Sequence, residues 1–281
     1  MKLLICTQTV DKNDPVLGFF VRWIEEFEKY CEVEVVSLKT LGSGGRLIRA
    51  WRLLRLAMRL EYDAVFVHMN PEYLIAAGWL WRLLGKKTAL WYAHGSDNLK
   101  LRVATAFVQV VLTSTTAGFR PHSKKVRIVG QGIDTNFFLP DPLVERGEHW
   151  LSVGRLTRSK RHDAAIAAAA RAGKNLRIAG EGPERAHLEA LARASGIRVD
   201  FLGPLTQVQL RDEYQRAALL IHRSETGSLD KVVLEAISCG LPVDSTDPHL
   251  GALPLNPADP AYVREHHSLQ KLIPAILAEL A

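Results

Sequence analysis

The chain has 281 residues, of which 47% are hydrophobic and 23% are charged, as in a globular protein with room for two domains. No segment reaches the ~20 uninterrupted apolar residues of a membrane span, and residues 1–10 predict a buried strand rather than a secretory signal. The net charge of +6 favours an anionic partner such as a phosphate, a lipid headgroup or a nucleic acid. The three cysteines (Cys6, Cys31 and Cys239) lack metal-binding spacing and predict reduced thiols in a cytoplasmic protein.

In the first half of the chain, short apolar runs alternate with amphipathic helical patterns. The runs predict strands at 2–6, 33–38, 64–68, 88–92, 108–113 and 126–129. Between them we expect helices at 19–30, 45–60 and 72–84, and a short turn near Ala117. This alternation is typical of a doubly wound α/β fold.

The second half restarts the same pattern. It predicts strands at 150–153, 176–179, 199–202, 219–222 and 242–243, with helices at 159–172, 183–194, 206–217 and 229–238. The proline-containing stretch 136–148 is the expected linker, and residues 269–280 form one more amphipathic helix. We therefore expect two Rossmann-like domains, at 1–140 and 141–265, that face each other across a cleft, and a C-terminal helix at 266–281 that packs back toward the first domain.

Residues 224–243 (SETGSLDKVVLEAISCGLPV) predict a helix whose start is open to a ligand. A polar turn that contains Gly227 precedes the helix, and Gly240 ends it. Backbone N–H groups at such a helix start suit a phosphate. Glu235 lies in the apolar part of the helix, where a carboxylate needs a partner such as the hydroxyls of a ribose or sugar. The stretch therefore indicates a sugar-nucleotide site.

A second stretch, VGRLTRSKRHD, places Arg155 and Lys160 just after a predicted strand. Two cations at the carboxyl end of a strand can bind a diphosphate, Arg155 with its fork and Lys160 as a point charge. The alternative is a solvated basic turn. For the nearby Gly180-Glu181-Gly182 turn, packing between strand and helix is the favoured interpretation.

The order of these motifs resembles that of the family-4 retaining glycosyltransferases (glycosyltransferase group 1). The resemblance is carried by VGRLTRSKRHDAAIAA, LRIAGEGPE, VDFLGPLT and LDKVVLEAISCGLPV in the second half, and by WYAHGS and VRIVGQGIDTNFF in the first. It covers nearly the whole chain and implies the B-type fold of that family in a short version.

The resemblance also implies roles for individual residues. Arg155 and Lys160 would bind the donor diphosphate, and His94 would reach the donor sugar or the reacting phosphate oxygen. The implied donor-binding residues are Gly18 at the first helix, Leu205 near the base, Ser228, Leu229, Asp230 and Lys231 at the phosphates and sugar, and Glu235 at the ribose. One departure is Gly227, which stands where the family motif has its first glutamate; Glu225 or Asp230 could substitute for it.

The implied reaction is metal-independent hexose transfer from a UDP- or GDP-linked sugar with retention at the anomeric carbon. The sequence contains no Asp-x-Asp, and we expect no cofactor besides the donor substrate. For His94, the alternative is a polar residue at a strand end without a chemical role. The base, the sugar, the acceptor and the oligomeric state stay open.

The predicted helix 45–60 carries a stripe of arginines opposite leucines. It is either a membrane-surface helix, which would suit a polyprenyl-linked or glycan acceptor at the inner face of the cytoplasmic membrane, or an ordinary surface helix. The acceptor-side candidates are Arg49, Arg52 and His68, and a structural strand end is an equal alternative for His68. Other interpretations are a sugar-nucleotide epimerase or hydrolase, and a basic membrane- or anion-binding protein without transferase activity. Nucleic acid is not expected, because the stripe lacks interleaved stacking aromatics.

Overall fold

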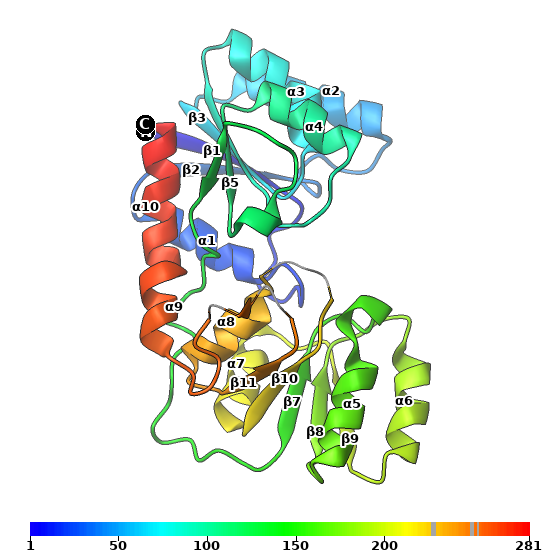
Figure 1. Ribbon diagram of the computed structural model, residues 1–281. Coiled ribbons are helices and arrows are strands. Elements are labelled where there is room, and N and C mark those ends of the chain that lie inside the picture. The colour runs from blue at the N-terminus through cyan, green and yellow to red at the C-terminus, as the bar shows by residue number, and fades with distance from the viewer. Residues whose placement is uncertain (226–228, 248–249, 252) are drawn as a thin grey trace. The chain divides into compact units, whose positions relative to one another are not determined.

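The computed structural model describes residues 1–225, 229–247, 250–251 and 253–281 (Figure 1). The chain divides into two compact units. The first unit contains Met1–Lys12, Val16–Gly132 and Leu269–Ala281, and the second contains Asn13–Pro15 and Ile133–Ser268. Residues 133–140, expected in the first domain, therefore lie in the second unit, and the last helix is part of the first.

The first unit is built on a parallel sheet in the order β2-β1-β3-β4-β5-β6. Its strands are β1 (Lys2–Thr7), β2 (Glu32–Ser37), β3 (Ala64–His68), β4 (Lys87–Trp91), β5 (Val110–Thr113) and β6 (Val126–Ile128). Each predicted strand of this half is present, with ends shifted by two residues or fewer. Such near-continuous apolar runs are expected when both faces of a parallel sheet are covered.

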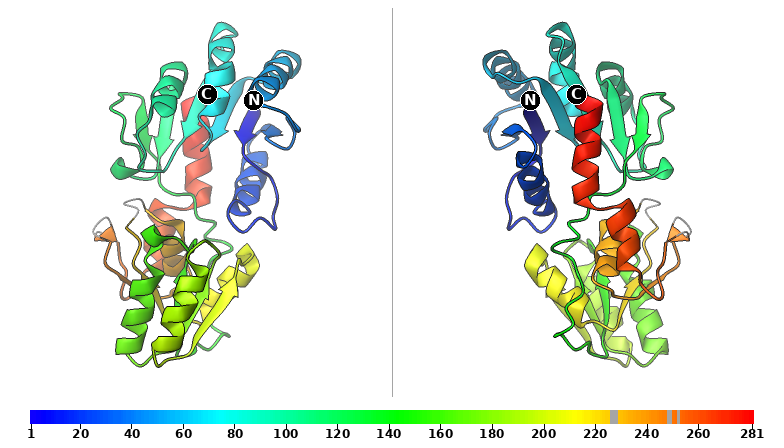
Figure 2. Two further views of the ribbon diagram at one scale, coloured as in Figure 1. Left: turned by 90° about the vertical axis from the view of Figure 1, so that its right-hand side faces the viewer. Right: turned by 90° about the vertical axis from the view of Figure 1, so that its left-hand side faces the viewer.

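Helices cover the two faces of this sheet through alternating strand residues (Figures 1 and 2). Leu3 and Ile5 pack with α1 (Phe19–Glu28) and α10 (Leu269–Leu280), whereas Leu4 and Cys6 face α2, α3 and α4. The latter helices span Arg46–Arg59, Glu72–Leu83 and Leu99–Phe107. Within the described residues, no helix combines the length and the apolar character that crossing a bilayer requires.

Helix α4 was not predicted from the sequence. Its segment, LKLRVATAF, buries only Leu101 and Ala104, so it has a weak amphipathic pattern, and its β-branched residues favour a strand. The start of the helix is fixed by Asn98, whose side chain accepts a hydrogen bond from the Leu101 N–H at 3.0 Å. Local capping and packing on α3 therefore override the residue preferences.

The second unit repeats the architecture with a parallel sheet in the order β11-β10-β7-β8-β9. The strands are β7 (Trp150–Val153), β8 (Leu176–Ala179), β9 (Val199–Gly203), β10 (Leu219–His222) and β11 (Val243–Ser245). The helices are α5 (His162–Arg171) and α6 (Arg185–Ala194) on one face, α7 (Gln207–Arg216) and α8 (Lys231–Ser238) on the other, and α9 (Pro260–His266) against α8. The sequence did not predict α9, which is only 7 residues long and begins at Pro260.

The predicted linker at residues 136–148 is a packed part of the second unit. Phe138 is only 2% exposed, and the Arg146 guanidinium donates hydrogen bonds to the carbonyls of Tyr214, Ala217 and Cys239 at 2.8–3.0 Å. Arg146 therefore satisfies carbonyls near the ends of α7 and α8. The prolines that suggested a linker mark an irregular but fixed segment.

The chain leaves the first unit at Gly132, which has a left-handed φ of 70°. A Cβ atom there would lie 2.4 Å from both Leu272 of α10 and the Trp23 ring of α1, so only glycine fits. The Trp23 indole N–H donates to the Gly132 carbonyl at 3.0 Å. This residue is thus fixed by the two helices that cover one face of the first sheet.

Candidate functional site

The order of strands in the second sheet marks a position for a ligand. Strand β7 is the first strand of this sheet along the chain and lies between β8 and β10, so the connections that follow β7 and β10 lead to opposite sides. In open parallel sheets, ligands bind outside the carboxyl ends of the strands at such a switch point. Gly154 and Arg155 follow β7 there, and Arg223 follows β10.

Lys160 lies in a hydrogen-bonded network at this edge. Its ammonium group is 2.5 Å from the Asp230 carboxylate and 3.3 Å from the Ser224 hydroxyl. The same Asp230 oxygen is 3.0 Å from Nε2 of His222, whose Nδ1 lies 3.1 Å from the hydroxyl of Ser245. Residues at the ends of β10 and β11, or just after β7 and β10, are thus brought together.

The network holds Asp230 in its charged form. Burial would by itself raise the pKa of the carboxyl, but the hydrogen bond from His222 and the charge of Lys160 act more strongly together, and the pKa lies well below its ordinary value. Lys160 therefore already has an anionic partner within the chain. An anion that binds at this position would therefore share Lys160 with Asp230.

Arg155 is exposed in the turn after β7, and in the part of the chain that the structure describes its guanidinium has no hydrogen-bond or ion-pair partner. The turn rests on the Gly180-Glu181-Gly182 segment. A Cβ atom at Gly180 would lie 2.0 Å from the carbonyl oxygen of Gly154, and one at Gly182 would lie 2.3 Å from that of Leu156. These glycines have a packing role, as predicted, but they pack against the backbone of the turn that carries Arg155 rather than between strand and helix.

Glu235 of α8 is 4% exposed and has a partner in the chain: the Tyr214 hydroxyl donates a hydrogen bond to its Oε2 at 3.1 Å. Lys231 lies one turn earlier on the helix. Burial raises the pKa of Glu235 and lowers that of Lys231 to about 8, and the charge of each opposes the shift of the other. The burial of Glu235 is therefore explained without a ribose, although a ribose contact is compatible with it.

The two carboxylates considered as substitutes at the Gly227 position both have cationic partners. Asp230 binds Lys160 as described, and Glu225 lies 2.5 Å from the guanidinium of Arg161. Gly227 itself and the donor-binding candidate Ser228 lie outside the described residues. The neighbouring Leu229 is buried, and Leu205 packs against the same apolar cluster.

In the first unit, Gly18 immediately precedes α1, as the sequence predicted. His94 follows β4 and has an exposed side chain, and its backbone N–H donates to the Gly118 carbonyl at 2.9 Å. His94 is thus placed at the carboxyl end of a strand, where a side chain can meet a ligand.

The acceptor-side candidates make structural contacts. The His68 ring is 2% exposed and stacks on Phe20 at a centroid distance of 4.1 Å, which supports its structural alternative. Arg49 donates to the Gly42 carbonyl at 3.3 Å, and Arg52 donates to the Leu41 carbonyl at 2.6 Å. Both arginines therefore fix the loop that leads into α2, and an acceptor contact would have to compete with these bonds.

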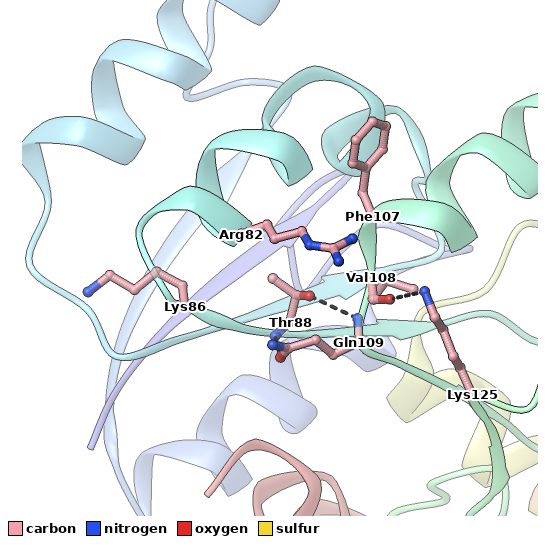
Figure 3. A pocket seen from close by; sticks show the side chains of 7 residues that line it. All are labelled: Arg82, Lys86, Thr88, Phe107, Val108, Gln109 and Lys125. Atoms are coloured by element: carbon pink, nitrogen blue, oxygen red, sulfur yellow. Dashed lines mark hydrogen bonds between the residues drawn. The ribbon is translucent and has the colours of Figure 1, made fainter.

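A small cavity of about 270 Å³ is lined by three cations (Figure 3). Lys125 donates hydrogen bonds to the carbonyls of Thr105 and Val108, at 2.7 Å each, and so caps the end of α4. Thr88 and Gln109 hydrogen-bond to each other beside it. The cavity lies at the amino ends of β4 and β5, away from the edge where ligands of this fold bind, so we assign it a structural role.

Burial of His162 predicts a pH-dependent stability. His162 begins α5, lies 2.9 Å from the Ser152 hydroxyl, and has its pKa lowered to about 4, chiefly by burial. The unfolded chain takes up this proton near pH 6.5, so stability is lost as the pH falls from about 6.5 toward 4. Urea titrations at pH 7.5 and pH 5 measure how much the free energy of unfolding falls between the two values. This fall should be about 2 kcal/mol smaller in His162→Gln than in the wild type.

The control is His187→Gln, because His187 is exposed on α6. An unchanged pH dependence in His162→Gln would show that His162 is not held neutral by the fold. His267, whose pKa burial also lowers to about 4, should keep part of the dependence in both variants.

The sequence of the second unit matches a known family. Residues 140–256 match the model of the glycosyl transferases group 1. This segment is a group 1 glycosyltransferase domain. The match contains the Arg155 turn, the network around Lys160, and α8 with Glu235.

Two curated relatives match parts of the chain. The gpi3 subunit of phosphatidylinositol N-acetylglucosaminyltransferase from Schizosaccharomyces pombe is 32% identical over 133 residues, which are 44% of this chain and 29% of the relative. D-inositol 3-phosphate glycosyltransferase from Streptomyces bingchenggensis is 35% identical over 101 residues, 31% of this chain and 21% of the relative. The matched part thus spans less than a third of either relative.

Solved structures show that the glycosyltransferase domain and the first unit together have the B-type fold. HepE from Anabaena, solved with UDP and glucose, has a TM-score of 0.68 at 18% identity over 99% of this chain and 89% of its own. Sucrose-phosphate synthase from Thermosynechococcus elongatus has a TM-score of 0.68 at 16% identity over 99% and 90%. At these identities the likeness concerns the fold, two Rossmann-like α/β domains.

Sequence reasoning missed several members of the network in the glycosyltransferase domain. His222 ends β10, Ser224 follows it, Ser245 ends β11, and Tyr214 lies on α7. The position of His222 at the end of a predicted strand was a usable signal. The contact between His222 and Asp230 could not be predicted, because it depends on the three-dimensional arrangement of the two residues. Among the described residues, no group of three or more His, Cys, Asp or Glu side chains is placed to hold a metal ion.

Proposed function

We propose that the protein is a retaining glycosyltransferase, which moves a hexose from a UDP- or GDP-linked sugar to a hydroxyl of a glycan or lipid-linked acceptor. The observation that carries this proposal is the exposed Arg155 beside Lys160 at the switch point of the glycosyltransferase domain. HepE was solved with UDP and glucose and also with UDP-glucose, which supports a UDP-sugar donor. Both curated relatives are named as glycosyltransferases, which supports the reaction class.

The proposed chemistry depends on charge that develops on the leaving diphosphate. The planar fork of Arg155 binds two phosphate oxygens, and Lys160 adds a compact charge. These cations stabilise the leaving group most strongly when the glycosidic bond is breaking. They supply positive charge of the kind that a metal supplies in other transferases, so we propose that the reaction needs no metal and no further cofactor.

Retention follows if the acceptor hydroxyl attacks from the face that the diphosphate leaves. Its proton then passes to a phosphate oxygen of the leaving group, and no carboxylate nucleophile is required. We assign His94 to the orientation of the sugar or to this proton transfer. The two carboxylates near the motif, Asp230 and Glu225, are bound to Lys160 and Arg161, which agrees with a mechanism without a covalent intermediate.

The remaining roles concern donor binding. Glu235 binds the ribose hydroxyls, Leu205 packs near the base, and the phosphates and the sugar contact the backbone at the start of α8. These donor-binding residues are Gly18, Leu205, Ser228, Leu229, Asp230, Lys231 and Glu235.

Exposed apolar and basic residues on α2 support a peripheral contact with an anionic membrane. Leu47, Trp51 and Met58 are 87%, 58% and 65% exposed, and the Arg55 guanidinium lies 5.4 Å from the centre of the Trp51 ring. Such residues combine apolar insertion with attraction to anionic lipids. We propose a cytoplasmic protein at the inner face of the cytoplasmic membrane. A membrane- or anion-binding protein without transferase activity is the second candidate, on the same observation.

Donor binding can be tested with a thermal-shift screen of UDP, GDP and their sugars. A nucleotide at about 100 times its dissociation constant should stabilise the wild type by roughly 2.7 kcal/mol. Arg155→Ala should reduce this stabilisation and the slow release of nucleoside diphosphate from the sugar nucleotide. Arg171→Ala, an exposed arginine at the end of α5, is the matched control.

Two outcomes would contradict the proposal. If no nucleotide or sugar nucleotide binds or is turned over, the protein is not a transferase, and the second candidate remains. If a nucleotide binds and stabilises Arg155→Ala as much as it stabilises Arg171→Ala, the donor site lies elsewhere.

A further inference from the structure

The first unit contains a large cavity that the donor site does not use. It has a volume of about 650 Å³ and is lined by residues that follow β1, β2 and β3, by residues of α2 and α3, and by Lys100 of α4. Its lining is mainly apolar, with Leu38, Leu41 and Leu53 on one side and Ile75 and Ala76 of α3 on the other. This volume is in the range of about 300–1,000 Å³ that is typical of sites for small ligands.

The topology of the first sheet favours a ligand at this position. In the order β2-β1-β3-β4, the connection after β1 leads to one side of the sheet and the connection after β3 leads to the other. Gln8 follows β1 and Asn70 follows β3, and both line the cavity. The cavity therefore adjoins the switch point of the first sheet, the same kind of position at which Arg155 and Lys160 lie in the second sheet.

The cavity also has basic lining residues. Arg46, Arg49 and Lys100 line it, against the single carboxylate of Glu72. Lys100 lies 3.3 Å from that carboxylate, and Arg49 is bound to a backbone carbonyl. Across the described parts of the chain, the exposed guanidinium of Arg46 meets no hydrogen-bond or ion-pair partner, so it is available to an anion.

Exposed apolar side chains are also present on α2. Leu47 lines the cavity and is 87% exposed, whereas Ile48 and Trp51 of the same helix are 49% and 58% exposed and do not line it. Exposed apolar side chains on one helix are a feature of surfaces that bind a nonpolar partner or a membrane. Charge and apolar character together match a molecule with a hydrocarbon chain and an anionic headgroup.

We propose that this cavity binds the hydrocarbon chain of a membrane lipid acceptor that carries a phosphate, with Arg46 at the phosphate and Leu47 and Trp51 in the membrane surface. That this lipid is an acceptor rests on the proposed function. Among the proposed acceptors, the cavity favours a lipid over a free glycan. The binding of the lipid itself does not depend on sugar transfer.

The test uses alkyl phosphates of eight to twelve carbons as probes, below their micelle concentrations, with isothermal titration calorimetry on the protein without nucleotide. If the chain lies in the cavity, each added methylene should tighten binding roughly fourfold. Ala50→Phe should fill the cavity and weaken dodecyl phosphate at least about tenfold, because Ala50 of α2 lines it. The control is Ala167→Phe, at an exposed position of α5.

The headgroup contact is tested separately. Arg46→Gln should weaken dodecyl phosphate by roughly tenfold, as expected for a charge-assisted contact worth about 1.4 kcal/mol, whereas Arg59→Gln on the same helix should not. Arg59 is exposed and does not line the cavity. This variant keeps the test valid if Ala50→Phe does not fold.

The proposal is overturned if affinity does not depend on chain length, if inorganic phosphate binds as well as dodecyl phosphate, or if Arg46→Gln and Arg59→Gln behave alike. The donor screen is independent of these results. Chain-dependent binding without any nucleotide binding would refute the transferase and leave the lipid site, and the reverse result would refute only the lipid site.

Discussion

Lys160→Ala is expected to lower kcat/KM for donor turnover by about 10²–10³-fold, the usual cost of removing one group that stabilises charge in the transition state. Lys160 lies at the carboxyl edge of the second sheet, 2.5 Å from the carboxylate of Asp230. Its loss removes a cation from the proposed diphosphate site and one of the partners of Asp230. Steady-state kinetics with the sugar nucleotide found in the donor screen measures the effect.

The same change should cost about 1–3 kcal/mol of stability, because it removes a partner from a mostly buried carboxylate. Activity is therefore compared at a temperature where the variant is folded, as shown by circular dichroism. Lys174→Ala is the control, since the Lys174 side chain is 43% exposed and lies 3.8 Å from Glu148. Equal kcat/KM values for the two variants would exclude Lys160 from the reaction.

The second large effect concerns Glu235. Glu235→Ala leaves the buried Tyr214 hydroxyl without its acceptor and removes the charge that opposes the pKa shift of Lys231, so we expect a loss of about 3 kcal/mol in the free energy of unfolding. Glu235→Gln keeps an oxygen that accepts from Tyr214 and should lose less. If Glu235 binds the ribose, both variants should bind the nucleoside diphosphate at least about tenfold more weakly.

Urea unfolding and calorimetry of nucleotide binding separate these two roles. Glu189→Gln serves as the control, because Glu189 is 38% exposed on α6 and pairs with Arg185. A Glu235→Gln variant that binds nucleotide as the wild type does would restrict Glu235 to its contacts with Tyr214 and Lys231.

The sequence predicted the α/β pattern well because buried parallel strands are short apolar runs bounded by turn residues. Strands β3 and β7 have the predicted ends. Helix α4 was missed because its apolar face is narrow, and α9 because it is short. The stretch 136–148 was taken for a linker because its composition does not reveal that Arg146 binds carbonyls of α7 and α8.

Single-residue environments were harder to predict than elements. The burial of His68 depends on which face of β3 receives α1, and the sequence of β3 is apolar on both faces. The partners of Lys160 come from positions 64 to 70 residues away, so only the parallel pairing of β7 with β10 reveals them. The position of Arg155 was easier to predict, because it follows directly from the end of β7 in the sequence.

The first unit takes its last helix, α10, from the other end of the chain, and this affects the order in which the protein is completed during synthesis. Until residues 269–281 have been made, the face of the first sheet that carries Trp23, Phe66 and Trp91 lacks one of its two covering helices. The second unit, whose residues end at Ser268, can be completed before the first. A deletion of residues 269–281 therefore damages the core of the first unit.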